Sequence, residues 1–328
     1  MTKRNEPMKP LYEKLKNLGY TKSYIKKMLP DWWNDKLANT KAGYQQAAII
    51  LAQIFNVNYK SLLLKEEAFF EFPNHCFKKQ KNIETKNLDP ATSVALSISK
   101  LILKEFDREL KELSALTAQT IRNEILQNNP WVDFVSLVNY CWDIGIPVVF
   151  LKDMPSPKMQ GIALNLNKRP IIVLTNGKKH GYLVFDLAHE LGHIIKNHIS
   201  DNSLILDDKI DKYDTFEQEK EANEFALELL TGKDNTAFFS SKTLTAEELS
   251  NAALSYGREY QIDPMHVILN YAYSQRIMPM GQGAINYFVK DQKISDTDQA
   301  ICQSVFLRNF DIDRLGDREE SLRRLMGV

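Results

Sequence analysis

Hydrophobic residues recur with a helical period in two stretches of the chain, residues 8–65 and 91–144. Apolar residues three or four positions apart fall on one face of a helix. The first stretch contains two such stripes: Leu11, Leu15 and Leu18, then Ala47, Ile50, Leu51, Ile54 and Phe55. The second stretch predicts helices at 91–106, 112–127 and 131–143. We therefore expect a helical module over residues 1–70, a polar linker at 71–90, and further helices beyond it.

The pattern changes after residue 144. Gly145, followed by Pro147, is typical of the end of a helix. Three runs rich in β-branched and aromatic residues then predict short strands: Ile146–Leu151, Gly161–Leu166 and Pro170–Thr175. Helical spacing returns at 181–198 and 215–230, and 243–276 predicts two or three more helices. The tail, 286–328, is mixed and charged. The pattern indicates an α+β protein with a small sheet.

Composition and charge add few constraints. Hydrophobic residues make up 44% and charged residues 26% of the 328 positions, as in an ordinary globular protein. The 42 basic and 42 acidic residues cancel, so net charge indicates no nucleic-acid or membrane partner. The first 27 residues depart from this balance, with eight basic against two acidic residues. A basic N-terminus can bind nucleic acid, but a solvated lysine-rich helix face gives the same pattern.

The cysteines and the N-terminus indicate a compartment. Cys76, Cys141 and Cys302 are odd in number and far apart, which argues against a disulfide framework and for a reducing environment. The opening Met-Thr-Lys-Arg-Asn-Glu-Pro lacks the apolar segment of a signal peptide, and no apolar run is long enough to span a bilayer. We expect a cytoplasmic protein with no membrane partner.

The strongest chemical signal is the run His189-Glu190-Leu191-Gly192-His193. Histidines four apart share one face of a helix, where their imidazoles can bind one Zn²⁺ at about 2.0–2.1 Å each. In this motif the glutamate acts as the general base on the water that the metal activates. Two surface histidines on a structural helix would be the simpler reading. The apolar periodicity around the motif, after a strand and a turn, favours the metal site.

A catalytic zinc keeps three protein ligands and one open position, so a third ligand must come from elsewhere. The predicted helix at 215–230 offers five candidates: Glu217, Glu219, Glu221, Glu224 and Glu228. Its apolar stripe consists of Ala222, Phe225, Ala226 and Leu229. Glu219 and Glu221 flank this stripe on opposite edges, so helical geometry alone does not choose between them. His75, His180, His198 and His266 lack a paired spacing, and each is interpreted as a surface or hydrogen-bonded residue.

Residues from about 131 to 230 resemble the ImmA/IrrE family of metallopeptidases. The matching blocks, in chain order, are Gly145–Val148, Gly161–Leu164, Pro170–Leu174, Leu187–His193 and Glu221–Ala226. The resemblance implies a zincin-like core over 91–240, in which the sheet packs on the HExxH helix. It also implies that the third ligand is the glutamate before the alanine, Glu221. Val184 and Asp186 replace a basic and a small hydroxyl residue that the family usually has, which affects the surroundings of the metal rather than its ligands.

Two flanking modules follow from a weaker resemblance. The stretch Tyr44–Leu63 is similar to a phage-repressor helix-turn-helix, although it lacks the usual Thr-Gln opening of the second helix. A helical bundle that docks on the peptidase or on a partner explains the same pattern. The family often pairs its peptidase with helix-turn-helix modules. Residues 241–328 are expected to form a C-terminal helical module and tail.

Together these features predict a zinc-dependent endopeptidase, with His189, His193 and Glu221 as ligands and Glu190 as base. The strand at 170–174 is the expected edge on which an extended substrate adds. The resemblance implies that the substrate is a regulatory protein, a repressor or an antitoxin-like protein. One alternative is a DNA-binding transcriptional regulator that uses the zinc fold as sensor or scaffold. Another is a partner-binding protein with a vestigial peptidase.

Overall fold

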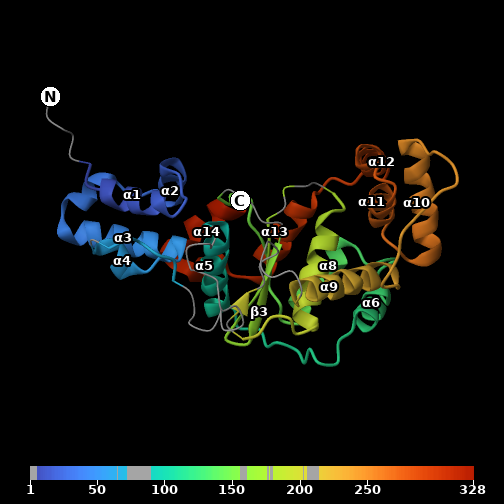
Figure 1. The fold of residues 1–328 in the computed structure, drawn as a ribbon, viewed down its shortest axis with the longest axis horizontal. Helices are drawn as coiled ribbons and strands as arrows, with labels where there is room; N and C mark the ends of the chain where they lie inside the picture. The colour runs from blue at the N-terminus through green and yellow to red at the C-terminus, as the bar shows by residue number, and fades with distance from the viewer. Residues whose placement is uncertain are drawn as a thin grey trace.

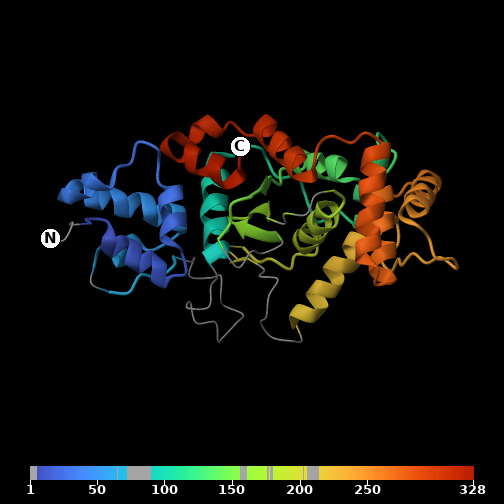
Figure 2. The same cartoon turned by 90° about the horizontal axis from the view of Figure 1, so that it is seen from above.

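The computed structural model describes residues 6–64, 66–71, 90–155, 161–175, 177, 180–201, 203–204 and 214–328, with the backbone alone at 203–204, 214–216 and 317. The predicted linker at 71–90 lies almost wholly outside these residues, as do His75 and Cys76. Helical segments at both ends flank a central α+β part with a small sheet (Figures 1 and 2). Among the described helices, none combines the length and the apolar character needed to cross a bilayer.

The N-terminal part is helical, as predicted. It consists of α1 (Lys9–Asn17), α2 (Lys22–Met28), the 3-10 helix η1 (Asp35–Asn39), α3 (Lys41–Phe55) and α4 (Tyr59–Leu63). Both predicted stripes face inward, with Leu11, Leu15, Leu51 and Phe55 fully buried. The side chains of Thr21, Thr40 and Asn58 accept backbone N–H groups at the starts of α2, α3 and α4, as N-cap residues do.

The central part contains the predicted strands and one more. Its elements are α5 (Pro90–Glu105), α6 (Ala118–Leu126), α7 (Phe134–Asp143), β1 (Val148–Phe150), β2 (Gly161–Leu166), β3 (Arg169–Leu174), α8 (Leu183–Ile195), β4 (Ser203–Leu204) and α9 (Asp214–Thr231). The predicted starts at 112 and 131 are wrong. Helix α6 begins only after Thr117 and α7 after Asp133, because each of these residues forms a capping box with the residue three positions on.

The sheet has the strand order β1-β3-β2-β4. Strand β3 pairs in parallel with β1 and antiparallel with β2, so the expectation that 170–174 forms a free edge is wrong. Its residues from Pro170 to Leu174 are all buried. Strand β4 pairs only with Leu164 and Asn165 of β2. Among the described residues, Gly161–Ala163 therefore has no partner strand on that side.

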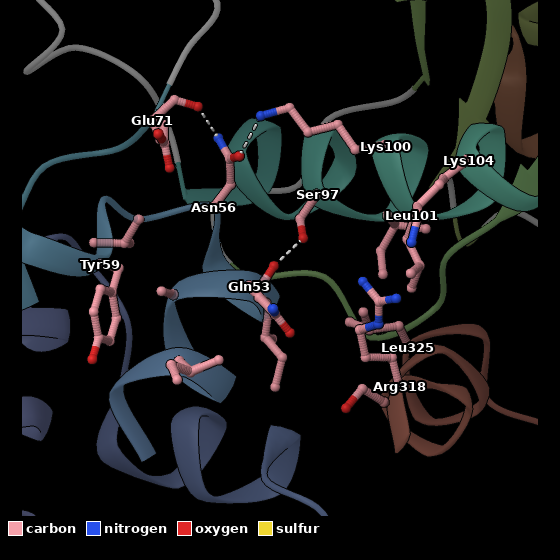
Figure 3. A pocket seen from close by; sticks show the side chains of 16 residues that line it. Gln53, Asn56, Tyr59, Glu71, Ser97, Lys100, Leu101, Lys104, Arg318 and Leu325 are labelled. Atoms are coloured by element: carbon pink, nitrogen blue, oxygen red, sulfur yellow. Dashed lines mark hydrogen bonds between the residues drawn. The ribbon is translucent and has the colours of Figure 1, made fainter. Parts of the chain in front are cut away.

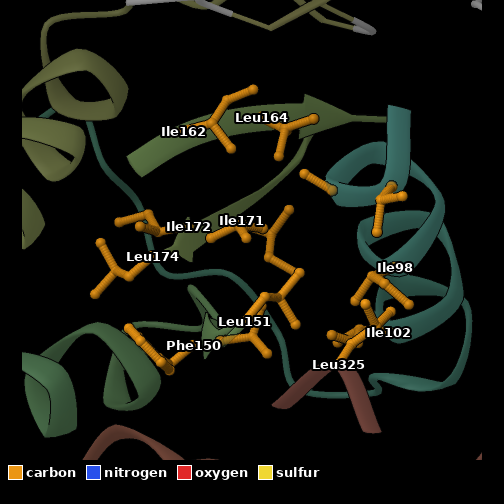
Figure 4. Packing of buried hydrophobic residues seen from close by; sticks show 14 of the residues in the cluster. Ile98, Ile102, Phe150, Leu151, Ile162, Leu164, Ile171, Ile172, Leu174 and Leu325 are labelled. Atoms are coloured by element: carbon orange, nitrogen blue, oxygen red, sulfur yellow. The ribbon is translucent and has the colours of Figure 1, made fainter. Parts of the chain in front are cut away.

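Helices cover both faces of the sheet. Helix α5 and helix α8 each contact β2 and β3, and Figures 1 and 2 both show the sheet lying between the two helices. Ile98 and Ile102 of α5 pack toward Leu151 and Ile171 in the core (Figure 4).

The C-terminal part forms two units. Helices α10 (Ala246–Tyr260), α11 (Pro264–Ser274) and α12 (Met278–Asp291) enclose a small apolar core of their own. Helix α13 (Asp298–Asn309), the 3-10 helix η3 (Ile312–Arg318) and α14 (Glu319–Met326) then return across the central part toward the N-terminal helices (Figure 2). Residues 286–328, which the sequence pattern indicated to be a mixed and charged tail, thus contribute buried residues to the main core, including Cys302, Phe306 and Leu325.

Polar contacts tie the N-terminal helices to the rest. Arg324 of α14 donates to the carbonyl oxygens of Lys27 and Leu29 and pairs with Asp31. The hydroxyl of Tyr24 donates to the carbonyl of Asp153 at 2.9 Å. One cluster of buried apolar residues continues from α1 through the sheet to α14.

Helix α11 begins at a buried carboxyl group. Asp263 is 2% exposed, its Oδ1 accepts the N–H of Met265 at 3.0 Å, and its Oδ2 has no hydrogen-bond partner among the described residues. Burial raises the pKa of Asp263 from 3.8 to about 8. Because the folded protein then binds this proton more tightly than the unfolded chain, the group makes the fold less stable as pH rises from about 4 to about 8.

Asp263→Asn keeps the cap and removes the charge. We expect the variant to match the wild type near pH 4 and to exceed its free energy of unfolding by about 1–3 kcal/mol at pH 8.5. Thermal unfolding of both proteins across this range measures the difference. If the melting temperatures of the two proteins follow parallel curves against pH, the Asp263 carboxyl does not have the raised pKa and does not cause the loss of stability.

Candidate metal centre

Two histidines on α8 face the neighbouring helix α9. His193 is fully buried and His189 is 8% exposed, and their Nε2 atoms lie 3.0 Å apart. Figure 1 shows α8 and α9 side by side, and these two helices share an extensive contact. Gly192 allows this approach, because a Cβ there would lie 3.0 Å from the Phe225 ring and 3.2 Å from the carbonyl oxygen of Ala222.

Glu219 of α9 completes a cluster of three donors. Its Oε2 lies 3.1 Å from His189 Nε2 and its Oε1 lies 3.3 Å from His193 Nε2. One ligand atom from each of the three residues falls within 4.8 Å of the others. Burial alone would raise the pKa of Glu219, but hydrogen bonds and charge attraction from the two histidines outweigh it and lower the pKa to about 2. The carboxylate is therefore ionised, which is the form that binds a metal.

Glu221 does not reach the two Nε2 atoms in this structure. Its side chain is 55% exposed, and its Oε2 lies 2.8 Å from Nε2 of His198. The expectation that Glu221 is the third ligand therefore differs from the arrangement found. Helix α9 turns the edge that carries Glu219 and Asn223, four residues apart, toward α8, whereas Glu221 is rotated about 200° around the axis from Glu219.

Each of the two histidines has a partner on its other ring nitrogen. His189 Nδ1 lies 3.1 Å from Oδ1 of Asn223, which can only accept, so the imidazole donates there and Nε2 keeps its lone pair. His193 Nδ1 lies 3.0 Å from His198 Nδ1. Asn223 thus orients the imidazole of His189.

His198 and Glu221 form an outer pair behind His193. Burial lowers the pKa of His198, although its hydrogen bond to Glu221 acts in the opposite direction. The sequence did not indicate this role, because His198 lies five residues after His193 and past the end of α8, outside helical spacing. It is brought back by a turn in which its N–H donates to the carbonyl of His193 at 3.0 Å.

Glu190 lies beside the cluster and beneath the start of β2. It is 3% exposed, and a Cβ at Gly161 would lie 2.9 Å from its Oε1. A cavity of about 190 Å³ lies between the start of β2 and helices α8 and α9, and its lining includes Gly161, His189, Glu190 and Glu219. A water or a substrate carbonyl in this cavity would lie beside His189, Glu219 and the Glu190 carboxylate. Glycine at 161 leaves room for that carboxylate.

Residues 141–242 match the family model described as the IrrE N-terminal-like domain, a peptidase family. The match includes α8, α9 and all the residues of the cluster, and it confirms the family resemblance seen in the sequence. The helix-turn-helix-like stretch at Tyr44–Leu63 gains no support from it. Neither the comparison with curated proteins nor that with solved structures found a match.

Proposed function

We propose, from the premise that residues 141–242 form an IrrE N-terminal-like peptidase domain, that this protein is a zinc-dependent endopeptidase with His189, His193 and Glu219 as metal ligands. The observation that supports this most is the convergence of three donor atoms within 4.8 Å, beside a buried glutamate in the same cavity. Two imidazoles and one carboxylate with an open position are the donor set of catalytic zinc sites. The α+β core with its HExxH helix is zincin-like, as predicted.

In the proposed reaction, each residue of the chain has one task. When bound, zinc supplies polarisation of the scissile carbonyl and a lowered pKa for the attacking water. The Glu190 carboxylate accepts a proton from that water and donates it to the amine nitrogen that leaves. Asn223 and His198 hold the two ligand imidazoles in orientation, and Glu221 acts only through His198.

The substrate strand is proposed to add to β2 rather than to β3. Among the described residues, the Gly161–Ala163 segment is unpaired on the side away from β3, and it begins beside Glu190. An extended peptide that hydrogen-bonds to this edge would bring its own backbone carbonyl to the cavity.

The proposed substrate is a regulatory protein in the cytoplasm, a repressor or an antitoxin-like protein, cut at one or few sites. The helical parts that flank the central domain support this, because a docked partner would have its scissile loop concentrated near the metal. The proposed division is a helical module over 1–70, a linker at 71–90, the peptidase at 91–240 and a helical module at 241–328.

Docking of a protein has more support than DNA binding at the N-terminus. Of the six lysines described within residues 6–27, five have partners inside the chain. Lys14, for example, donates to the carbonyl oxygens of Ser61 and Leu62 at 2.6 and 3.1 Å. A shift of promoter DNA that weakens with salt and persists in Glu190→Gln would instead favour the DNA-binding regulator.

Metal analysis tests the proposed ligands. We expect about one zinc per chain in the wild type and loss of zinc in His193→Ala and Glu219→Gln. Glu221→Gln is the matched control, because its amide can still contact His198, and it is expected to retain zinc with a loss of affinity of at most about tenfold. Loss of zinc in Glu221→Gln with retention in Glu219→Gln would reverse the assignment.

The substrate proposal is tested in cells and then with purified proteins. New N-termini are compared between cells that express the wild type and cells that express Glu190→Gln, and we expect few sites, concentrated in one regulator. The purified regulator is then compared with casein, each with and without a zinc chelator. Rapid chelator-sensitive digestion of casein at many sites would refute narrow specificity while leaving a metallopeptidase.

A further inference from the structure

A second, larger cavity lies where the N-terminal helices meet the central part. Its volume is about 460 Å³, and its walls come from α3, α4, α5 and the C-terminal segment of η3 and α14 (Figure 3). It shares no lining residue with the cavity beside His189. The volume is in the range of sites that hold small organic ligands.

The charged side chains of this cavity are mostly basic. Lys100, Lys104 and Arg318 line it, against one carboxylate, that of Glu71. Lys100 is held by its Nζ, which donates to Oδ1 of the buried Asn56 at 2.8 Å. The Asn56 amide donates in turn to the backbone carbonyl of Glu71 at 2.6 Å, so one wall is fixed by hydrogen bonds.

The other two cations have little compensation. Within the part of the chain that the structure describes, no carboxylate lies within 4.0 Å of Arg318, which is half-buried. Lys104, whose side chain is largely exposed, has a 3.6 Å ion-pair contact with its half-buried neighbour Glu105. Figure 3 shows Lys104 and Arg318 extending into the same side of the cavity, next to Leu101. An anion bound between these two side chains would supply the negative charge that the described residues do not place beside Arg318.

The remaining lining is apolar. It includes Ile54, Val57, Leu101 and Leu325, together with the ring of Tyr59. These side chains leave room beside the cations for an uncharged organic group. The cavity thus combines a cationic end with an apolar body.

We propose that this cavity binds a phosphate monoester with an apolar or aromatic body, its phosphate between Lys104 and Arg318. A dianion matches the excess of basic over acidic lining residues, and a guanidinium binds phosphate oxygens in pairs. The apolar walls take the organic group. Because the walls belong to α3, α5 and α14, the bound ligand fastens the N-terminal helices to the central part.

Calorimetry and thermal unfolding of the full-length protein test the proposal with four probes. Phenyl phosphate and adenosine monophosphate combine a phosphate with an organic body, whereas inorganic phosphate and adenosine each carry one half. We expect the two esters to bind one per chain and to raise the melting temperature by about 2 °C or more at saturating concentration. Inorganic phosphate and adenosine are expected to bind at least about tenfold more weakly.

Substitutions of the two cationic lining residues test whether the esters bind in this cavity. Lys104→Gln and Arg318→Gln are each expected to weaken binding of both esters by about tenfold or more, since each removes a charged contact. Lys290→Gln and Arg258→Gln, at exposed positions on α12 and α10, are the matched controls and keep the wild-type affinity. His193→Ala also keeps it, which separates this cavity from the metal centre and makes the result independent of peptidase activity.

Several outcomes would overturn the proposal. These are the absence of binding by both esters at millimolar concentration, unchanged affinity in Lys104→Gln and Arg318→Gln, and loss of binding in His193→Ala. Inorganic phosphate that binds as tightly as phenyl phosphate would also overturn it, because the apolar walls would then contribute nothing.

Discussion

Glu190→Gln is expected to lower the rate of peptide hydrolysis by about two or more orders of magnitude while the protein keeps its metal. The carboxylate is the proton acceptor in the proposed reaction, and an amide cannot accept and return that proton. Glutamine has nearly the same shape, so it fits beneath Gly161, where the present Oε1 lies 2.9 Å from the position of an added Cβ. The measurement is kcat on the identified substrate, together with zinc content.

Glu224→Gln provides the control for a lost carboxylate. Glu224 lies on α9 within the family match, but it is partly exposed and pairs with Lys220 at 3.5 Å rather than with the cluster. We expect this variant to cleave at the wild-type rate. Cleavage by Glu190→Gln at the wild-type rate would show that Glu190 is not the base. Loss of zinc in Glu190→Gln would show instead that this residue is needed to hold the metal.

The part of the site that lies on one helix was predictable from the sequence. The spacing of His189 and His193 determines that they share a face, and the apolar periodicity around them predicts that the helix packs against the core. The structure agrees, with both side chains buried against α9. The predicted strands at 161–166 and 170–174 also appear, because β-branched runs between turn residues are a local signal.

The choice between Glu219 and Glu221 depends on how α9 is rotated against α8, which is a tertiary property. Both residues border the same apolar stripe, so the periodicity of α9 is consistent with either. The contact of Gly192 with Phe225 and Ala222 sets the rotation, and it places Glu219 3.1 Å from His189. The order of strands was unpredictable for a similar reason. Strand β1 at the edge of the sheet is as fully buried as the interior strand β3, so composition and burial do not indicate which strand has two neighbours.

The position of helix α14 in the fold was not predicted from the sequence. Helix α14 carries Glu319, Glu320, Arg323 and Arg324, and such a charged segment reads as solvent-exposed. Its Leu322, Leu325 and Met326 are nevertheless fully buried against the rest of the chain. Their spacing is that of an apolar helix face. The local pattern does not indicate that this face packs near α5 and the N-terminal helices, more than 200 residues away in sequence.

Replacement of Arg122 is expected to have the largest effect on stability. This residue of α6 is 4% exposed, and its Nη1 donates to the carbonyl oxygens of Leu229 and Leu230 at 3.1 and 2.9 Å. Its Nη2 donates to those of Tyr260 and Gln261 at 3.4 and 2.7 Å. One guanidinium therefore satisfies carbonyl groups at the C-terminal ends of both α9 and α10, where the helix dipole also favours a cation.

Arg122→Met leaves these carbonyl groups buried without donors, and we expect it to lower the free energy of unfolding by about 3–5 kcal/mol. Arg122→Lys keeps the charge, but one ammonium cannot span both helix ends, so a smaller loss is expected. Arg258→Met, at an exposed position on α10, is the control and should change the free energy by no more than about 0.5 kcal/mol. Urea unfolding of the three variants measures these differences. Because α9 also carries Glu219, Arg122→Met is expected to bind zinc more weakly. If Arg122→Met keeps the stability and the zinc affinity of the wild type, Arg122 does not hold the two helix ends together.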